Sequence, residues 1–512
     1  MFQTTSRSFT TWISCSGGTP SSAGYDCCDQ NRSTTLQLLS PRWLRSPKKG
    51  FSLPEVTDVA IIGGGISGLT TAYYLSRAGI HSTLIERQPR LGGVIQTETT
   101  EGCVLEAGPD SFISAKPWAL ELIHDLGLAG ELIGSNDHLR VTYVKKGGSL
   151  IPLPDGLMMM VPTRFFPLLA TRLLSWGTKA RMAMECFRFR WGDSPQDDRS
   201  VAEFIRDHYG GEAVDYLAEP LLSGVYGGDP ERLSVASVLP GFFDLEQRHG
   251  SLTRGALIVR RIANNRSTRP LFQTLRGGLG KLVEALIRAA YPYMEVFQAT
   301  AETLERRPGK ILIQTTCGLV SASHVVLACQ ANEAAQLVRN VDEPLARLLA
   351  SIPYNSSVTV TLGYSKSTFN VPLNGFGFLV PKRERRRVIA CTWVGTKFPF
   401  RVPEDKVVLR CFLGGGDEAI LGESDKDLVA MVQEELREIM QLSVEPIFTR
   451  IARWPKSMAQ YTVGHRKRLD AITARLEGMP EILVAGNGYS GIGIPDCIRT
   501  GKHAALRIAA SV

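Results

Sequence analysis

Residues 59–69 read Val59-Ala60-Ile61-Ile62-Gly63-Gly64-Gly65-Ile66-Ser67-Gly68-Leu69, an apolar strand followed by a glycine turn and the start of a helix. The β-branched run suits a parallel strand that is covered on both faces. The first glycine permits a tight turn, the second lets the backbone approach a pyrophosphate, and the third allows close packing of helix on strand. A second strand at 82–85 delivers Glu86, which can accept a hydrogen bond from a ribose hydroxyl. The stretch predicts a dinucleotide-binding βαβ unit.

The composition is that of a globular protein with two or three domains. The 512 residues are 44% hydrophobic and 21% charged, with a net charge of +8. The basic residues form no stripe with interleaved aromatic residues, so we expect no nucleic-acid partner; the charge suits an anionic substrate or membrane surface. The ten cysteines and eight histidines show no metal-ligand spacing, so we expect no metal site.

Residues 1–52 differ in composition from the rest of the chain. They are rich in Ser and Thr and poor in acids, which predicts a disordered tail. The tail is either an organelle transit peptide or an extension from a misplaced start codon. The first alternative predicts a plastid or mitochondrial protein. If the protein is bacterial, we expect it to be cytoplasmic or peripheral to the inner (cytoplasmic) membrane.

Residues 156–191 crowd apolar side chains between the basic residues Arg164, Arg172, Lys179 and Arg181. No run of 18 apolar residues occurs, so no spanning helix is expected. The pattern favours an amphipathic segment that lies in the interface of one membrane leaflet, with its arginines reaching toward the headgroups. An ordinary buried helical subdomain is the alternative.

A second strand, glycine turn and helix closes the chain at residues 482–498, with Pro495 placed at the helix start. The N-terminus of this helix would stabilise the anion of a reduced flavin. Two such turns, at opposite ends of the chain, indicate FAD rather than NAD, because the longer cofactor needs two anchor points. The turn at 86–93, where Arg90 is placed to assist, and the bend at 108–111 offer further backbone amides to a phosphate.

The order of these motifs resembles that of the FAD-dependent protoporphyrinogen oxidase family. The segments that carry the resemblance are GGGISGL (63–69), ERQPRLGG (86–93), GPDSF (108–112), WPKSMAQYTVGH (454–465) and AGNGYSGIGIPDCI (485–498). They lie within residues 56–512. The resemblance implies non-covalent FAD and a six-electron oxidation of protoporphyrinogen IX by molecular oxygen, with release of hydrogen peroxide. Coproporphyrinogen III is the alternative substrate, and an amine oxidase or carotenoid desaturase type of flavoenzyme is a third hypothesis.

The resemblance also implies which residues contact the ligands. Arg140 would pair with a substrate propionate, and Leu379 and Trp393 would wall the macrocycle. No catalytic residue or general base is assigned. The implied flavin contacts are Gly63, Gly64, Gly65, Ile66, Ser67, Gly68, Glu86, Arg87, Gly93, Gly108, Pro109, Asp110, Ser111, Val296, Trp454, Ile492, Gly493 and Ile494.

The expected fold is α/β, with three domains. A Rossmann-like FAD-binding domain would comprise residues 56–115, 268–345 and 455–512. A strand-rich substrate domain would comprise 116–154, 225–267 and 346–454, and a helical, membrane-associated domain 155–224. The expected partners are a porphyrinogen and molecular oxygen; peripheral membrane contact and a homodimer stay open.

Overall fold

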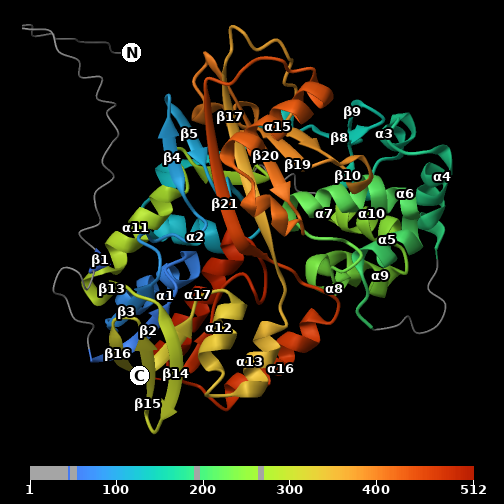
Figure 1. Ribbon diagram of the computed structural model, residues 1–512. Coiled ribbons are helices and arrows are strands. Elements are labelled where there is room, and N and C mark those ends of the chain that lie inside the picture. Colours follow the sequence, from blue (N-terminus) through green and yellow to red (C-terminus); the bar gives the residue numbers. More distant parts are fainter. Residues whose placement is uncertain (1–43, 46–54, 189–196, 263–269, 512) are drawn as a thin grey trace, which may run out of the picture. The chain divides into compact units, whose positions relative to one another are not determined.

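The computed structural model describes residues 44–45, 55–188, 197–262 and 270–511 (Figure 1). The chain divides into two units, Met1–Arg42 and Trp43–Val512, and the first lies outside the described residues. Of the expected tail at 1–52, only β1 (Leu44–Arg45) is described, and it pairs in parallel with β13 (Met294–Gln298) at the edge of a sheet. The disorder expected for the rest of the tail lies outside the described residues.

The βαβ unit forms the centre of the first sheet (Figure 1). β2 (Val56–Ile62), α1 (Ile66–Arg77) and β3 (Ser82–Glu86) follow one another, and β2 pairs in parallel with β3 and with β16 (Gly318–Leu327). Ala60 and Ile61 are fully buried, because helices cover both faces of a parallel sheet. The strand order is β1-β13-β3-β2-β16-β15-β14, with β15 at Lys310–Thr315, β14 at Ala301–Arg307 and β22 (Ile482–Val484) also pairing with β16.

Two groups of helices cover this sheet. Alternate residues of β2 pack into opposite cores: Ile61 belongs to one and Ala60 to the other. The first core contains α1, α2 (Trp118–Asp125), α11 (Gly280–Ala290) and α17 (Ile494–Ala509). The second contains α12 (Ala331–Val338), α13 (Glu343–Ala350) and α16 (His465–Glu477). α2 therefore packs on the first sheet, although residues 116–154 were expected in the substrate domain.

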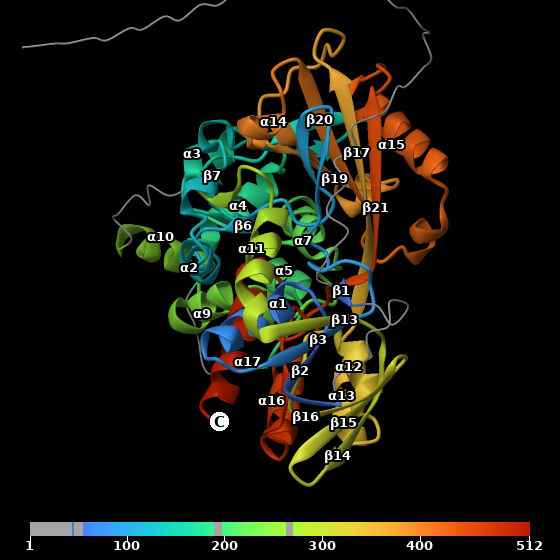
Figure 2. The same ribbon diagram turned by 90° about the vertical axis from the view of Figure 1, so that its left-hand side faces the viewer.

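The second sheet has the strand order β21-β17-β20-β19-β18-β8-β9. α15 (Asp425–Met440) covers one of its faces, where Val358, Val360 and Leu436 share a core (Figure 2). Because side chains alternate along a strand, Thr359 lies on the opposite face. The strands are β21 (Phe448–Ala459), β17 (Tyr354–Ser365), β20 (Lys406–Gly414), β19 (Val388–Trp393), β18 (Gly377–Leu379), β8 (Thr142–Lys146) and β9 (Ser149–Pro152).

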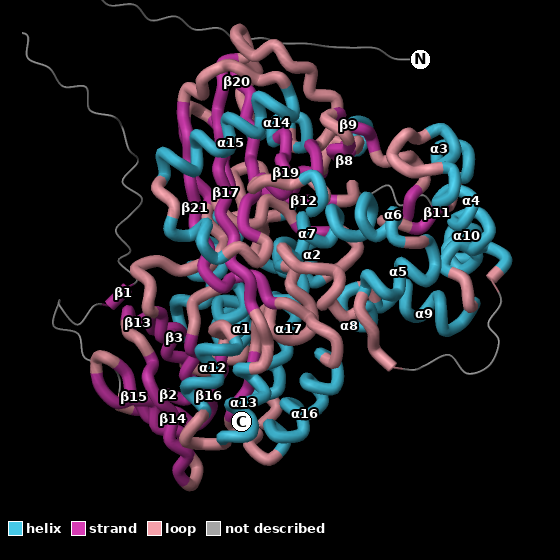
Figure 3. The backbone as a smooth tube through the Cα atoms, turned by 45° about the vertical axis from the view of Figure 1, so that its right-hand side comes forward, coloured by secondary structure: helices cyan, strands magenta, loops and turns pink. Residues whose placement is uncertain are grey.

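Helices gather in a third region between residues 165 and 262 (Figure 3). Residues 225–262 belong to it, although 225–267 were expected in the strand-rich domain: Val235, Leu245 and Leu252 share a core with Met182. The helices are α3 (Phe165–Ala170), α4 (Trp176–Met184), α5 (Val201–Tyr209), α6 (Gly211–Ala213), α7 (Glu219–Tyr226), α8 (Val235–Val238), α9 (Pro240–His249) and α10 (Leu252–Ile262), with a π-helix at Val214–Ala218 between α6 and α7. The local signals for α9 are Pro240 at its start and Gly250, with φ of 68°, at its end.

Three short sheets complete the structure. β4 (Thr97–Thr100) pairs with β5 (Cys103–Glu106), and β10 (Leu157–Met158) pairs with β11 (Val161–Pro162). β12 (Phe272–Leu275) lies between β6 (Phe112–Ile113) and β7 (Leu132–Gly134). Over the described ranges, no helix is both long enough and apolar enough to cross a membrane.

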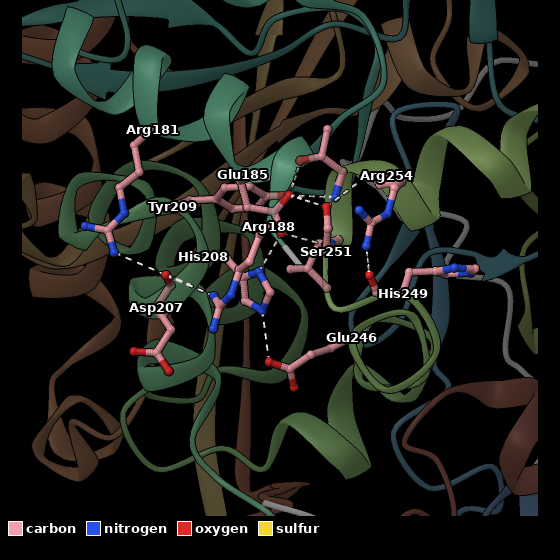
Figure 4. Close-up of polar contacts among 12 residues, drawn as sticks. Arg181, Glu185, Arg188, Asp207, His208, Tyr209, Glu246, His249, Ser251 and Arg254 are labelled. Carbon is pink, nitrogen blue, oxygen red and sulfur yellow. Dashed lines mark hydrogen bonds and ion pairs between the residues drawn. The ribbon is translucent and has the colours of Figure 1, made fainter. Parts of the chain in front are cut away.

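A buried polar cluster ties the helical region together (Figure 4). The Glu185 carboxylate, just after α4, accepts hydrogen bonds from the backbone N–H groups of Leu252 and Thr253 at 2.8 and 3.0 Å. His208 of α5 places Nδ1 2.7 Å from Glu185 Oε1 and Nε2 3.1 Å from Glu246 Oε1. Glu185 therefore joins the end of α4 to the start of α10, and the His208 imidazole joins Glu185 to Glu246 of α9.

Candidate functional site

The first glycine turn leaves an open space in front of α1. Side chains at Gly63 and Gly68 would collide with the protein itself, since an added Cβ would lie 2.7 Å from the Ala328 carbonyl oxygen and 2.0 Å from that of Gly63. A Cβ on Gly65 would meet only the Gly93 Cα, at 4.0 Å. No side chain caps α1 at Gly65, so the N–H groups of its first turn, including those of Ile66 and Ser67, are available to a ligand.

The acid at the end of β3 lies beside this turn. Glu86 Oε2 accepts from the Gly64 N–H at 2.7 Å, and Oε1 accepts from the Gln88 N–H at 2.8 Å. Each carboxylate oxygen has a further lone pair, so Glu86 can still accept from a ribose hydroxyl. Arg87 turns toward Glu333, at 3.4 Å.

The turn at 90–93 packs directly on the first one. The Gly92 N–H donates to the Gly64 carbonyl at 2.8 Å, and Gly93, with φ of 58°, faces Gly65. Arg90 was expected to assist in binding a phosphate. Its guanidinium instead donates to the carbonyl oxygens of Gly93 at 2.6 Å and Ile95 at 3.3 Å. Its role in the structure is to hold the turn.

The bend at 108–111 is wedged against the same turn. A Cβ on Gly108 would lie 1.8 Å from the Val94 carbonyl oxygen. Pro109 follows, and Asp110 accepts from Ser111 Oγ at 2.6 Å and from Lys397 Nζ at 2.9 Å. Burial raises the pKa of Asp110, but Lys397 and Arg410 outweigh it and hold this pKa well below its usual range. The Asp110 carboxylate is therefore ionised and committed to protein contacts.

The closing turn presents a second uncapped helix start. Gly493 is the N-cap of α17, without a side-chain cap, and lies between the half-buried Ile492 and the buried Ile494. The Tyr461 hydroxyl accepts from the Gly491 N–H and donates to the Asn487 carbonyl, both at 2.7 Å. Burial lowers the pKa of His465 to about 4, so at neutral pH this neutral ring can donate to the Tyr489 carbonyl, 2.9 Å from Nε2. Tyr461 and His465 thus hold the loop before α17.

The two helix starts are brought together by a close helix crossing. Ser67 Oγ donates to the Cys497 carbonyl at 3.0 Å, and Thr71 Oγ1 donates to the Gly501 carbonyl at 3.1 Å. A Cβ on Gly501 would lie 2.3 Å from the Ser67 carbonyl oxygen. The open space at Gly65, the carboxylate of Glu86 and the uncapped start of α17 together fit a dinucleotide with a flavin at its far end.

Two further residues expected at the flavin occupy different environments. Val296 is 2% exposed in β13, which pairs with a strand on each side, and its side chain packs in the core of the first sheet. Trp454 of β21 donates its indole N–H to the Ala107 carbonyl at 2.9 Å, and the Arg90 guanidinium lies 5.9 Å from its ring centroid. Trp454 therefore contacts both segments that flank the first turn.

The three expected substrate residues do not form one wall. Leu379 of β18 faces α7, where a Cβ on Gly224 would lie 3.1 Å from Leu379 Cδ2. Trp393 of β19 is 3% exposed in the core under α15, on the opposite face of the sheet. Trp393 is thus a core residue, because strand alternation turns it away from Leu379. Arg140 is exposed just before β8, which pairs with β18, and its guanidinium has no hydrogen-bond or ion-pair partner within the described residues.

Several residues near this site were not anticipated. Arg401 is 1% exposed and pairs with Glu106 at 2.9 Å, and Arg410 is buried in β20. The local signal for Arg410 is a cation within the otherwise apolar run Val407-Val408-Leu409-Arg410-Cys411-Phe412-Leu413. A charge in such a strand has to find buried partners. The partners themselves come from distant segments, which the local pattern does not reveal.

Comparisons with known proteins agree with this geometry. A family described as flavin containing amine oxidoreductase matches residues 66–509. The coproporphyrinogen III oxidase of Bacillus subtilis (strain 168) is 35% identical over 460 residues, which cover 87% of this chain and 96% of the relative. The chloroplastic protoporphyrinogen oxidase 1 of Arabidopsis thaliana is 29% identical and covered over 88% of each chain. A crystal structure from Exiguobacterium sp. 255-15, provisionally assigned as a protoporphyrinogen oxidase, has a TM-score of 0.80 at 30% identity and covers 90% of this chain and 100% of its own.

Proposed function

Because this chain belongs to the flavin containing amine oxidoreductase family, in the branch of the porphyrinogen oxidases, we propose that it oxidises a porphyrinogen to the corresponding porphyrin. The protein is an FAD-dependent oxidoreductase. In the proposed reaction, three molecules of oxygen accept six electrons and six protons from each porphyrinogen and leave as three molecules of hydrogen peroxide. The observation that carries the proposal is the match to the Bacillus subtilis enzyme over 96% of that enzyme's length.

The choice between two porphyrinogens follows from the same relatives. The relative named for coproporphyrinogen III is 35% identical to this chain, and the relative named for protoporphyrinogen is 29% identical. We therefore rank coproporphyrinogen III as the first candidate substrate and protoporphyrinogen IX as the second. Both are anionic, so an unpaired guanidinium near the substrate is useful to either, and Arg140 is the candidate for a propionate.

The residues of the chain supply position rather than acid–base chemistry. FAD, when bound, accepts the two electrons removed in each oxidation step. The N-termini of α1 and α17 would bind its charged and electron-rich parts through backbone N–H groups. Leu379 and the close packing of α7 on β18 offer an apolar surface on the side of the second sheet that faces away from α15. A macrocycle held against this surface would be oriented by apolar contact.

The test is turnover by purified, FAD-loaded protein. Porphyrinogens are not fluorescent and porphyrins are, so the product is followed directly, with each substrate supplied in air. We expect turnover of coproporphyrinogen III to exceed that of protoporphyrinogen IX. Yellow, FAD-bound protein that turns over neither substrate would contradict the proposed function, and hydrogen peroxide released at three equivalents per porphyrin would support it.

A second proposal concerns membrane contact by the helical region. Phe166, Trp176 and Phe187 are 83%, 71% and 74% exposed. The basic residues expected to reach toward headgroups mostly serve the protein instead: Arg164 pairs with Asp155 at 2.6 Å, and Lys179 donates to the Leu169 carbonyl at 2.8 Å. We therefore propose that exposed aromatic side chains, rather than arginines, make a peripheral contact with an anionic membrane.

Vesicle flotation tests this contact. A Phe166→Ser, Phe187→Ser double variant should float less with anionic vesicles than the native protein, because it removes exposed apolar area and leaves the net charge unchanged. Leu506→Ser, at a 53% exposed position on α17, is the matched control. Equal flotation of all three proteins would exclude this surface as the contact.

A further inference from the structure

One carbonyl oxygen, that of Ala107, accepts hydrogen bonds from three neighbouring strands of the second sheet. The donors are the Thr359 hydroxyl of β17 at 2.9 Å, the Trp454 indole of β21 at 2.9 Å and Arg410 Nη2 of β20 at 3.2 Å. A carbonyl oxygen has two lone pairs, so three donors exceed what a buried acceptor ordinarily needs. The convergence joins the second sheet to a single peptide of the nucleotide-binding side.

That peptide lies between the second sheet and the first glycine turn. The Ala107 N–H donates to the Gln96 carbonyl at 2.9 Å, so both backbone groups of this residue are engaged. The next residue, Gly108, lies against the Val94 carbonyl, which follows Gly93. Because Gly93 faces Gly65 at the start of α1, the Ala107–Gly108 peptide is only two contacts away from the space in front of that helix.

Arg410 makes the strongest case for a positioning role. Its side chain also donates to the Gly108 carbonyl, and the residue is 4% exposed. Within the described part of the chain its side chain hydrogen-bonds only to these two carbonyl groups, and its Nε has no hydrogen-bond partner. A buried guanidinium costs several kcal/mol of desolvation unless its charge is used. Here the charge of Arg410 faces the carboxylates of Asp110 and Glu106, and its guanidinium donates to the carbonyl groups of two successive residues, Ala107 and Gly108.

We propose that Arg410 and Thr359 are positioning residues for FAD. Together with Trp454 they fix the position of the bend at 108–111 relative to the cofactor. The second sheet, which carries the substrate side, thereby fixes a segment of the cofactor side. Asp110 and Lys397 hold the far end of the same bend. The inference rests on FAD binding and is independent of which porphyrinogen the protein oxidises.

The experiment measures FAD binding to apoprotein without any porphyrinogen, so its outcome is separate from that of the proposed function. Thr359→Val removes one donor with little change of shape. We expect a rise of about threefold in the FAD dissociation constant and a shifted visible absorption spectrum of the bound flavin. Thr361→Val is the matched control, because Thr361 lies two residues along the same strand and makes no hydrogen bond to Ala107 within the described residues.

Arg410 is tested with a neutral and a charged replacement. Arg410→Gln should raise the FAD dissociation constant about tenfold, and Arg410→Lys should recover part of that loss, because it keeps the charge but not the fork. Unchanged FAD affinity and an unchanged flavin spectrum in Thr359→Val and Arg410→Gln would overturn the proposal, as would equal changes in Thr361→Val. If Arg410→Gln does not fold, the comparison of the two threonine variants decides the matter alone.

Discussion

The Ser67 hydroxyl donates to the Cys497 carbonyl across 3.0 Å, although 430 residues separate the two positions in the chain. Ser67 lies in the first turn of α1 and Cys497 in the first turn of α17. This contact places the two uncapped helix starts on the same side of the first sheet. A cofactor with two ends can therefore be held by turns from opposite ends of the sequence.

Gly65 and Gly68 should respond differently to the same substitution. Gly65→Ala should leave the free energy of unfolding of the apoprotein within about 0.5 kcal/mol of native, because the added Cβ meets open space. The same variant should fail to retain FAD, because the cofactor is expected to occupy that space. Gly68→Ala should destabilise the apoprotein by about 3 kcal/mol, since its Cβ would lie 2.0 Å from the Gly63 carbonyl oxygen. Urea unfolding of the apoproteins and the ratio of flavin to protein absorbance measure both effects. A Gly65→Ala protein that stays yellow would refute the assigned role of Gly65.

The helix crossing depends on the absence of a side chain at Gly501. Gly501→Ala should lower stability by about 2 kcal/mol and reduce FAD content, because its Cβ would lie 2.3 Å from the Ser67 carbonyl oxygen and push α17 away from α1. Gly478→Ala is the control, since its Cβ meets its nearest neighbour at an ordinary 3.5 Å. Thermal unfolding and the flavin content of the purified variants provide the measurement. Equal behaviour of the two variants would show that the crossing tolerates a methyl group.

Tyr461 should matter through its hydroxyl alone. Tyr461→Phe keeps the ring that stacks on His465 at a centroid distance of 4.1 Å but releases both ends of the loop 487–491. We expect a loss of about 1–2 kcal/mol in stability and weaker FAD binding, because a buried N–H and a buried carbonyl each lose their partner. Isothermal titration of apoprotein with FAD gives the affinity. Tyr364→Phe, in the core of the second sheet, should leave that affinity unchanged.

The buried cluster around Glu185 should make stability fall in acid. Burial raises the pKa of Glu185, but hydrogen bonds from His208 and Thr253 outweigh it and leave the pKa below its usual value. A carboxyl with a lowered folded-state pKa contributes stability that is complete above its unfolded pKa, about 4.3, and is lost as the pH falls through the folded value. The unfolding free energy of native protein should therefore drop below about pH 4.3.

Glu185→Gln should remove that part of the pH dependence and cost about 3 kcal/mol at pH 7, because the new amide nitrogen cannot accept the buried hydrogen bonds that the carboxylate accepts from Ser251, Leu252 and Thr253. Glu231→Gln, which breaks an exposed ion pair with Arg206, should cost about 0.5 kcal/mol or less. Urea titrations at a series of pH values, followed by circular dichroism, measure both. If Glu185→Gln keeps the native slope in acid, other carboxyl groups dominate the acid response.

Arg140 should act on substrate affinity. Arg140→Gln should raise the KM for coproporphyrinogen III about tenfold with little change in kcat, because it removes a charge that pairs with a propionate in the ground state and the transition state alike. Arg347→Gln, at an exposed i,i+4 pair with Glu343, is the control. Steady-state porphyrin fluorescence measures both constants. An unchanged KM would mean that other cations receive the propionates.

The parts of the protein that the sequence predicted are those with a strong local pattern. The βαβ unit and the closing turn lie where their glycine spacing and apolar runs indicated, and β17, β18, β19 and β20 lie within the range 346–454 that was expected to be rich in strands. Glycine spacing carries this much information because the clash at Gly68 and the turn at Gly63 involve neighbours in the same motif or in the adjacent strand. The cofactor type followed from having two such motifs.

Tertiary structure decided the features that depend on distant neighbours. Residues 225–262 join the helical region because their apolar side chains pack with α4 and α5, and no local signal says which core a helix will enter. Leu379 and Trp393 fall on opposite faces of one sheet, since a difference of one step in strand register reverses the direction of a side chain. Arg90 holds its own turn rather than a phosphate, because nearby carbonyl groups lie within its reach.

By itself, the sequence determined that this protein has a dinucleotide-binding unit and a second helix start suited to a flavin, because both depend on backbone conformations that glycine alone permits at low cost. Only the tertiary structure decided that Thr359, Arg410 and Trp454 meet at the Ala107 carbonyl. Three strands must pair in one register before their side chains can converge on a single oxygen atom, and that register is a property of the assembled sheet.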